Sequence, residues 1–219
     1  MIGYHIPAIP TLYRGRKYRS RLEARWAAFF DRLGWKHEYE PFDLGAWSPD
    51  FLLYGETTLG LPTKALVEVK PISSFDAEVG QKMLDVQLAR QDLWDAQLLL
   101  LGVAPFWTDR AFGVATLGWC AHEKVFGKEG MGTVVAHTAQ FKAFVRYPDR
   151  KLVFDFGDWS YPPGGHLTGL DSQFIPGLPH IYAPDLLETP QHREELSNHL
   201  MGVWARSSNV VQYQRGGVS

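Results

Sequence analysis

Cysteine is nearly absent from this 219-residue chain, which contains only Cys120. A single cysteine excludes an internal disulfide framework and a cysteine-rich zinc site. Long apolar runs are missing too, since the longest, at about 96–104, is interrupted by Gln97 and Gly102. A membrane-spanning helix needs about 20 mainly apolar residues, and the N-terminus lacks the apolar core of a secretory signal. We therefore expect a soluble cytoplasmic protein with no membrane partner.

An excess of charge of either sign is also missing. The chain has 22 Lys and Arg against 24 Asp and Glu, a net charge of −2. This balance argues against a nonspecific nucleic-acid coat. The basic residues are nevertheless clustered, and between residues 13 and 36 they outnumber the acidic ones by eight to two. The cluster predicts a phosphate-contacting surface, with an ordinary solvated face as the alternative. The residues we expect to contact phosphate are Arg14, Arg16, Lys17, Arg19, Arg21 and Arg25.

Apolar residues make up 45% of the chain and aromatic residues 14%, which is sufficient for a packed core. Helical periodicity is clear from Ser20 to Leu33, where Gly34 should end the helix. A second helix is expected at 76–95 and a third at 190–205. Strands are expected at 35–40, 47–54, 65–71, 97–103, 113–119, 133–136, 141–147 and 151–156. This alternation predicts an α/β layered core at 1–105 and a β-rich C-terminal extension at 106–219, of unknown role and packed on the core.

The most informative pattern joins two of these strands. Asp50 lies in the first, and Glu68 and Lys70 lie in the second. Because side chains alternate along a strand, Glu68 and Lys70 point the same way, and a hairpin would place Asp50 beside them. Converging carboxylates are costly to bury unless a partner neutralises them, and a divalent cation is suited to oxygen ligands. The alternative is an exposed cross-strand pair at a sheet edge.

Pro49-Asp50 followed by Glu68-Val69-Lys70 resembles the signature of the PD-(D/E)XK nucleases, and the resemblance covers roughly residues 13–105. It implies a restriction-endonuclease-like core, with a mixed central sheet flanked by helices. It also implies Mg²⁺ (or Mn²⁺) held by Asp50, Glu68 and the Val69 carbonyl, with Lys70 positioning the attacking water. Many members carry a glutamate on the preceding helix, which makes Glu23 a further candidate ligand.

Two of the implied site residues have ordinary structural explanations as well. Ser20-x-x-Glu23 is a capping box, in which the glutamate would serve the helix terminus rather than a metal. Gln87 lies within the apolar arc of the second predicted helix, where relatives often carry a polar residue near the site. An ordinary, partly exposed glutamine is the alternative. Both Glu23 and Gln87 are retained as candidate catalytic residues, beside Asp50, Glu68 and Lys70.

The resemblance implies a metal-dependent deoxyribonuclease that hydrolyses phosphodiester bonds with a metal-activated water. The order of the motifs is similar to that in the endonuclease subunits of Tn7-type transposons and in compact phage-encoded nucleases. The alternative is a catalytically silent or partner-dependent nucleic-acid-binding subunit of a phage or recombination complex. DNA is the expected partner, with protein partners expected in a replication, recombination or transposition complex.

Overall fold

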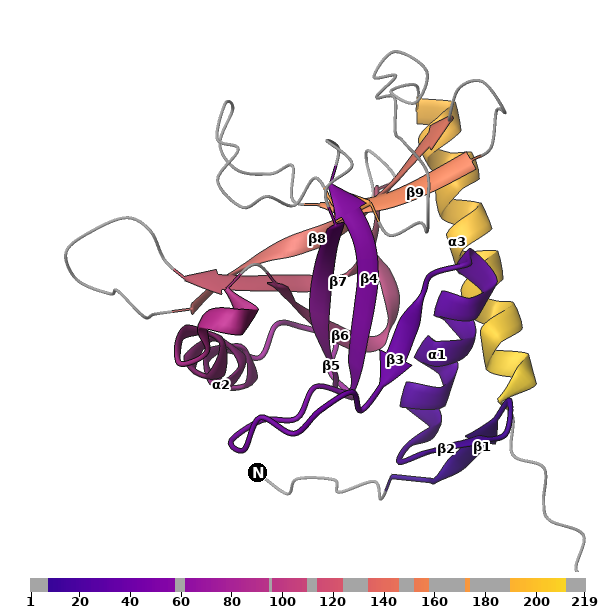
Figure 1. The fold of residues 1–219 in the computed structure, drawn as a ribbon. Helices are drawn as coiled ribbons and strands as arrows, with labels where there is room; N and C mark the ends of the chain where they lie inside the picture. The colour runs from indigo at the N-terminus through magenta and orange to yellow at the C-terminus, as the bar shows by residue number, and fades with distance from the viewer. Residues whose placement is uncertain are drawn as a thin grey trace, which may run out of the picture.

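The computed structural model describes residues 8–57, 62–94, 96–109, 114–123, 134–145, 152–157, 172–173 and 190–211. Within them the protein is an α/β structure with a mixed sheet and three α-helices (Figure 1). The strands of the large sheet are β3 (His37–Tyr39), β4 (Phe51–Thr57), β5 (Pro62–Val69), β6 (Ala96–Asp109), β7 (Val114–Glu123), β8 (Val134–Val145), β9 (Leu152–Gly157) and β10 (Ser172–Gln173). They are hydrogen-bonded in the order β10-β9-β8-β7-β6-β5-β4-β3, and β10 also pairs with β4.

The first helix, α1 (Arg21–Leu33), begins and ends where the sequence predicts. The Ser20 hydroxyl accepts the Glu23 N–H at 3.1 Å and caps the N-terminus. Gly34 ends the helix in the left-handed conformation, with a φ of 73°, which glycine adopts without steric strain. A separate hairpin of β1 (Thr11–Tyr13) and β2 (Arg16–Tyr18) precedes the helix.

The second predicted helix is shorter than expected. Helix α2 (Ala77–Leu88) is capped by Asp76, whose carboxylate accepts the N–H groups of Glu78 and Val79. A short 3₁₀ turn, η1 (Gln91–Leu93), follows it. The third helix, α3 (Pro190–Val210), extends beyond the predicted end at 205. Within the segments that the structure describes, no helix is long and apolar enough to cross a membrane.

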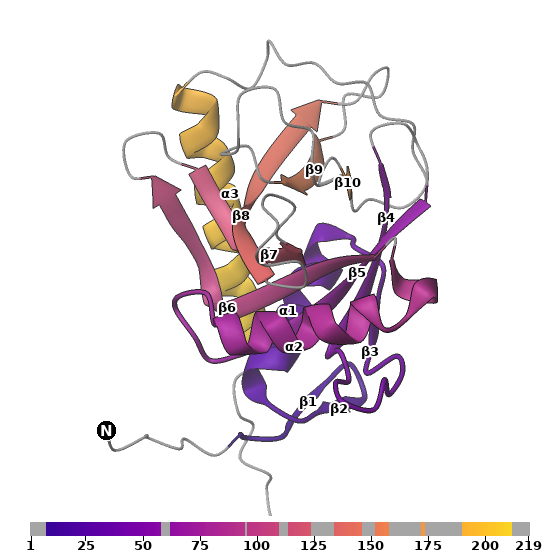
Figure 2. The same ribbon diagram turned by 90° about the vertical axis from the view of Figure 1, so that its left-hand side faces the viewer.

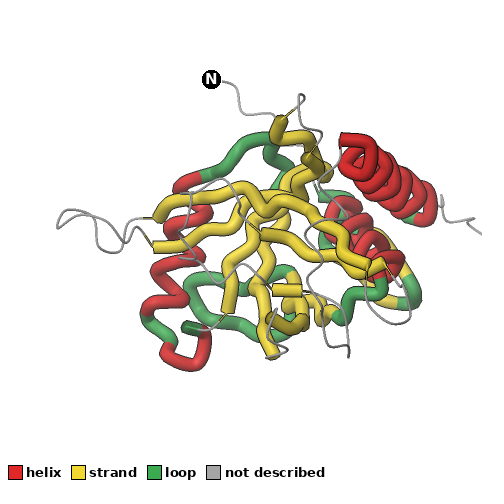
Figure 3. The backbone as a smooth tube through the Cα atoms, turned by 90° about the horizontal axis from the view of Figure 1, so that it is seen from above, coloured by secondary structure: helices red, strands yellow, loops and turns green. Residues whose placement is uncertain are grey.

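The helices form layers on the two faces of the sheet. Helices α1 and α3 lie side by side on one face (Figures 1 and 3). Trp26 of α1 packs on Trp204 of α3, with ring centroids 4.5 Å apart. Helix α2 covers the other face and lies in front of the sheet in Figure 2. Phe51 and Val67 belong to the first core, and Leu66 to the second. Strand alternation therefore separates the two cores.

The pairing of the central strands determines where the predicted carboxylates lie. Strands β4 and β5 are antiparallel, and Phe51 is in register with Val67. Strand β5 then pairs in parallel with β6, and α2 lies in the connection between them. Asp50 is the residue just before β4, so continuing the register places it opposite Glu68, at the same end of the pair.

Strand β6 spans residue 105, where the sequence predicts the core to end. The antiparallel strands β7, β8 and β9 continue the same sheet from β6, and α3 packs against α1. These elements correspond to the strands predicted at 113–119, 133–136, 141–147 and 151–156. A single strand, β8, covers most of the two strands predicted at 133–136 and 141–147. The sequence also predicts a loop at 160–179, and all of this stretch except 172–173 lies outside the described residues.

Candidate functional site

Asp50 is buried at the junction of two strands. Its side chain is 3% exposed, and its Oδ2 atom accepts the Val69 N–H at 2.7 Å. The Oδ1 atom accepts a hydrogen bond from Nη2 of Arg19. One main-chain donor and one side-chain cation thus hold the carboxylate at the end of β5, next to Glu68 and Lys70.

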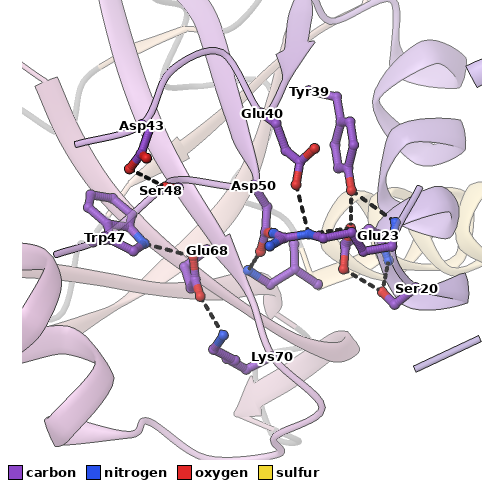
Figure 4. Close-up of polar contacts among 12 residues, drawn as sticks. Ser20, Glu23, Tyr39, Glu40, Asp43, Trp47, Ser48, Asp50, Glu68 and Lys70 are labelled. Carbon is purple, nitrogen blue, oxygen red and sulfur yellow. Dashed lines mark hydrogen bonds and ion pairs between the residues drawn. The ribbon is translucent and has the colours of Figure 1, made fainter. Parts of the chain in front are cut away.

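Glu68 is held by two neighbours from different segments. Its Oε2 accepts the Trp47 indole N–H at 2.7 Å, and its Oε1 pairs with the Lys70 ammonium at 2.5 Å (Figure 4). Because Val67 and Val69 lie in the core beside α1, Glu68 and Lys70 project to the other face of β5. The Glu68 side chain is 8% exposed, whereas that of Lys70 is 42% exposed. The pair therefore joins a buried carboxylate to a cation that reaches solvent.

The loop before β4 places the Trp47 indole. The Asp43 carboxylate accepts the Gly45 N–H and the Ser48 hydroxyl, both at 2.9 Å. The Leu44 N–H bonds to the Trp47 carbonyl at 3.1 Å, and Gly45 has a φ of 81°. This tight turn packs Trp47 into the core beside α2, with its N–H directed at Glu68.

Arg19 connects Asp50 to two further carboxylates. Its Nε lies 2.7 Å from Oε1 of Glu40 and 3.9 Å from Oε2 of Glu23. The Arg19 N–H donates to the Tyr39 hydroxyl at 3.0 Å, which fixes its main chain. Glu40 has a φ of 45°, an uncommon value for a residue other than glycine. The predicted phosphate contact Arg19 is thus part of a carboxylate cluster.

Glu23 lies both at the helix cap and at the site. Its buried carboxylate accepts the Ser20 hydroxyl at 2.7 Å and the Tyr39 hydroxyl at 2.5 Å (Figure 4). Burial and the bond to Glu23 raise the pKa of Tyr39, which keeps that phenol a donor even at alkaline pH. The glutamate therefore contacts the cap residue and also lies beside Arg19, so the two explanations of Glu23 do not exclude each other.

The electrostatics of Asp50 reflect its burial. Burial and the negative charge of Glu68, with a smaller effect from Glu23, raise its pKa from 3.8 to about 7, against the opposing effects of the Val69 N–H and Arg19. The cluster contains two cations, Arg19 and Lys70, and four carboxylates, those of Glu23, Glu40, Asp50 and Glu68. The cluster is short of positive charge when all four are ionised.

The donor chemistry fits a divalent cation at Asp50 and Glu68. Both are carboxylates, both are buried, and the charge of Glu68 raises the pKa of Asp50. Among the described residues, no group of three or more Asp, Glu, His or Cys side chains is arranged to hold a metal ion. A cation here would take two carboxylates, with main-chain oxygens and water as further ligands, as Mg²⁺ sites commonly do. Val69 contributes its N–H to Asp50, and its carbonyl is at the same strand end.

Gln87 is directed elsewhere. Its amide nitrogen donates to the carbonyls of Leu93 and Ala96, at 3.0 and 2.5 Å. Ala96 is in register with Lys64, four residues before Glu68 on β5, or roughly 13 Å along the strand. The structure therefore brings together Asp50, Glu68, Lys70, Val69 and Glu23. It directs the amide of Gln87, from α2, to the start of β6 instead.

The six candidate DNA contacts fall into two groups. Arg16, Lys17 and Arg21 are exposed on β2 and at the start of α1. The other three are engaged within the protein. Arg14 pairs with Asp31, Arg19 pairs with the carboxylates, and Arg25 stacks on the Trp204 ring at 4.4 Å and bonds to Ser208.

No protein-family model, curated protein or solved structure matches this chain. The sequence and the site geometry are therefore the basis of any functional proposal.

Four side chains of the site do not follow from the sequence patterns. Trp47, Tyr39 and Glu40 belong to no predicted motif, and the basic cluster predicts only a phosphate contact for Arg19. The only signals for them are proximity to Pro49-Asp50 and the alternation of the strand at 35–40. Glu23 is four residues from Arg19, but the other carboxylate partners, Glu40 and Asp50, are too far away in sequence for a local pattern to join them.

Proposed function

We propose that this protein is a Mg²⁺- or Mn²⁺-dependent DNA nuclease with a PD-(D/E)XK site on a restriction-endonuclease-like core. The observation that carries the proposal is the meeting of Asp50 with the Glu68–Lys70 pair at one end of β4 and β5. Seventeen residues separate Asp50 from Glu68 in the chain, and the strand register aligns the two. Buried carboxylates next to a solvent-reaching lysine suit hydrolysis of a phosphodiester.

In this proposal Asp50 and Glu68 bind the divalent cation. When bound, the cation would neutralise charge on the scissile phosphate and lower the pKa of the attacking water. Lys70 pairs with Glu68 and reaches solvent, so its ammonium can orient that water and stabilise the developing negative charge on the phosphate. Trp47 holds Glu68 in its orientation through the indole N–H.

The exposed group of basic residues supplies the proposed DNA contacts. Arg16, Lys17 and Arg21 flank Arg19 in sequence, and Arg19 bonds to Asp50. A phosphate backbone that follows this segment would therefore reach the carboxylate site. The remaining parts of the proposal rest on the sequence: a cytoplasmic location on its composition, and protein partners in replication, recombination or transposition on the resemblance.

A catalytically silent or partner-dependent DNA-binding subunit is the second candidate. The observation that favours it is the set of protein donors to the carboxylates. Both oxygens of Asp50 and both oxygens of Glu68 already accept a hydrogen bond or ion pair. Such a cluster satisfies its carboxylates through Arg19, Lys70 and neutral donors.

Incubation of the purified protein with supercoiled and linear DNA separates the two candidates. The nuclease predicts cleavage with Mg²⁺ or Mn²⁺ and none with EDTA. Cutting of the supercoiled circle would further identify endonuclease action, because a circle has no ends. DNA binding without cleavage under any of these conditions would contradict the nuclease and support the second candidate.

A further inference from the structure

We propose that Arg19 competes with the divalent cation for Asp50, and that cation binding releases its guanidinium to a substrate phosphate. This inference rests on the proposed function and adds a residue and a coupling to it. It begins with the Asp50 carboxylate. The Val69 main-chain N–H donates to Oδ2, and the guanidinium of Arg19 donates to Oδ1.

The main chain of Arg19 is held in place while its side chain reaches solvent. The Arg19 N–H donates to the Tyr39 hydroxyl, and Ser20, the next residue, caps α1. The side chain is nevertheless 57% exposed. A long side chain on a fixed main chain can exchange one anionic partner for another without moving α1.

The charge of the site explains why the exchange depends on a cation. Four carboxylates surround two cations, and Arg19 alone pairs with Asp50, Glu40 and Glu23. A phosphodiester that approaches this cluster is repelled. A divalent cation on Asp50 and Glu68 supplies the missing charge and takes over the neutralisation of Asp50. The guanidinium, which binds phosphate through its fork of donors, is then available to the substrate.

Two linked effects follow. The cation and DNA should bind cooperatively, since each favours the arrangement in which Arg19 has left Asp50. Replacement of Arg19 by a neutral residue should therefore strengthen cation binding and weaken the cation-dependent part of DNA binding. A residue that merely orients Asp50, or stabilises the fold, would not change these two affinities in opposite directions.

The first test is Mn²⁺ affinity, measured from the free-ion signal by electron paramagnetic resonance. We expect Arg19→Gln to bind Mn²⁺ about tenfold more tightly than wild type, the effect of removing one unit charge about 6 Å from a divalent ion in a water-like dielectric. Arg19→Lys keeps the charge and should stay near wild type. An unchanged or weaker affinity in Arg19→Gln would overturn the inference.

Asp50→Asn distinguishes that failure from failure of the metal site itself. If Asp50→Asn binds Mn²⁺ as well as wild type and Arg19→Gln do, Asp50 holds no metal. The proposed function then fails, and the inference fails with it. If Mn²⁺ binding depends on Asp50 but Arg19→Gln does not strengthen it, only the inference fails. Circular dichroism and unfolding curves establish that each variant is folded.

The second test is the affinity for a fluorescent DNA duplex in a Lys70→Met background, which suppresses cleavage. We expect Mn²⁺ to tighten DNA binding when Arg19 is present, and Arg19→Gln to abolish most of that tightening. Arg21→Gln is the matched control, since this exposed arginine is two residues away. It should weaken binding equally with and without Mn²⁺. An equal Mn²⁺ effect in Arg19→Gln and its parent would contradict the release of Arg19.

Discussion

The Asp50 carboxylate accepts the Val69 N–H at 2.7 Å. Val69 directly follows Glu68, so the bond ties one carboxylate of the motif to the neighbour of the other. This hydrogen bond crosses from the start of β4 to the end of β5. It places the Asp50 charge next to Glu68 inside the protein, where burial raises the pKa of Asp50 to about 7. Asp50 is therefore the group on which both the stability and the proposed chemistry of the site depend.

The stability of the metal-free protein should depend on the titration of Asp50. The folded pKa, about 7, lies above the ordinary value of 3.8, so the folded state favours the protonated acid. Asp50 should therefore destabilise the fold as pH rises from about 4 to 7, by up to about 4 kcal/mol. We expect Asp50→Asn to be more stable than wild type at pH 8 and similar to it near pH 4. Urea unfolding across this range measures the difference, and parallel pH profiles would contradict it.

Trp47 should be needed to orient Glu68. Trp47→Phe removes the indole donor and leaves one oxygen of a buried carboxylate without its hydrogen bond, which costs about 1–3 kcal/mol. We expect lower stability together with weaker cation binding. Trp94→Phe is the matched control, because Trp94 is 60% exposed and should change stability by no more than about 0.5 kcal/mol. Equal unfolding midpoints for the two variants would refute this role of Trp47.

Gly102 should be required for the backbone after Lys70 to pack on β6. The Lys70 N–H bonds to the Leu101 carbonyl at 2.9 Å, and a Cβ at Gly102 would lie 2.5 Å from the Ile72 carbonyl oxygen. Gly102→Ala should therefore cost about 1–3 kcal/mol and displace the segment that carries Lys70.

Gly202→Ala, in α3, is the control for that substitution. Among the described residues, its Cβ would meet only the flexible end of Arg206, at 3.2 Å, and alanine favours a helix over glycine by about 1 kcal/mol. We expect Gly202→Ala to raise the midpoint of thermal unfolding and Gly102→Ala to lower it. The reverse order would show that the contact at Ile72 is relaxed without strain.

Salt dependence should separate the exposed basic residues from the engaged ones. The triple substitution of Arg16, Lys17 and Arg21 by glutamine should reduce the slope of log affinity against log salt by about 0.9 for each phosphate that is no longer neutralised. Arg25→Gln should leave the slope unchanged, since Arg25 stacks on Trp204. Fluorescence anisotropy at salt concentrations from about 50 to about 200 mM measures both slopes. An unchanged slope in the triple variant would remove this segment from the DNA surface.

The sequence predicts local features of this fold better than their limits. Ser20 and Gly34 identify both ends of α1, because each acts on the backbone next to it. The end of α2 is missed by several residues, since apolar residues continue past Leu88 and no glycine marks the turn. The strand β6 continues beyond the predicted end at 103 because the irregularity between Leu101 and Phe106 interrupts its pairing with β7 without ending the strand.

The same limit applies to the candidate site. The convergence of Glu68 and Lys70 follows from strand alternation, and that of Asp50 from a hairpin register, so both are predictable. The roles of Arg19 and Gln87 are not. Arg19 lies among basic neighbours, yet its partners come from α1, from the residue after β3 and from the start of β4. Gln87 shares the apolar arc of its helix, but its amide is bonded to the carbonyls of Leu93 and Ala96.

The most direct test of the nuclease is cleavage of a supercoiled plasmid at pH 8 with Mn²⁺ by wild type, Asp50→Asn and Asp92→Asn. Asp92 is the control, an exposed carboxylate in η1 that pairs with Arg90 and lies by Lys64, near the start of β5. We predict nicked or linear product from wild type and Asp92→Asn, and a reduction of at least about a hundredfold in rate for Asp50→Asn. Undiminished cleavage by a folded Asp50→Asn would contradict the proposed site.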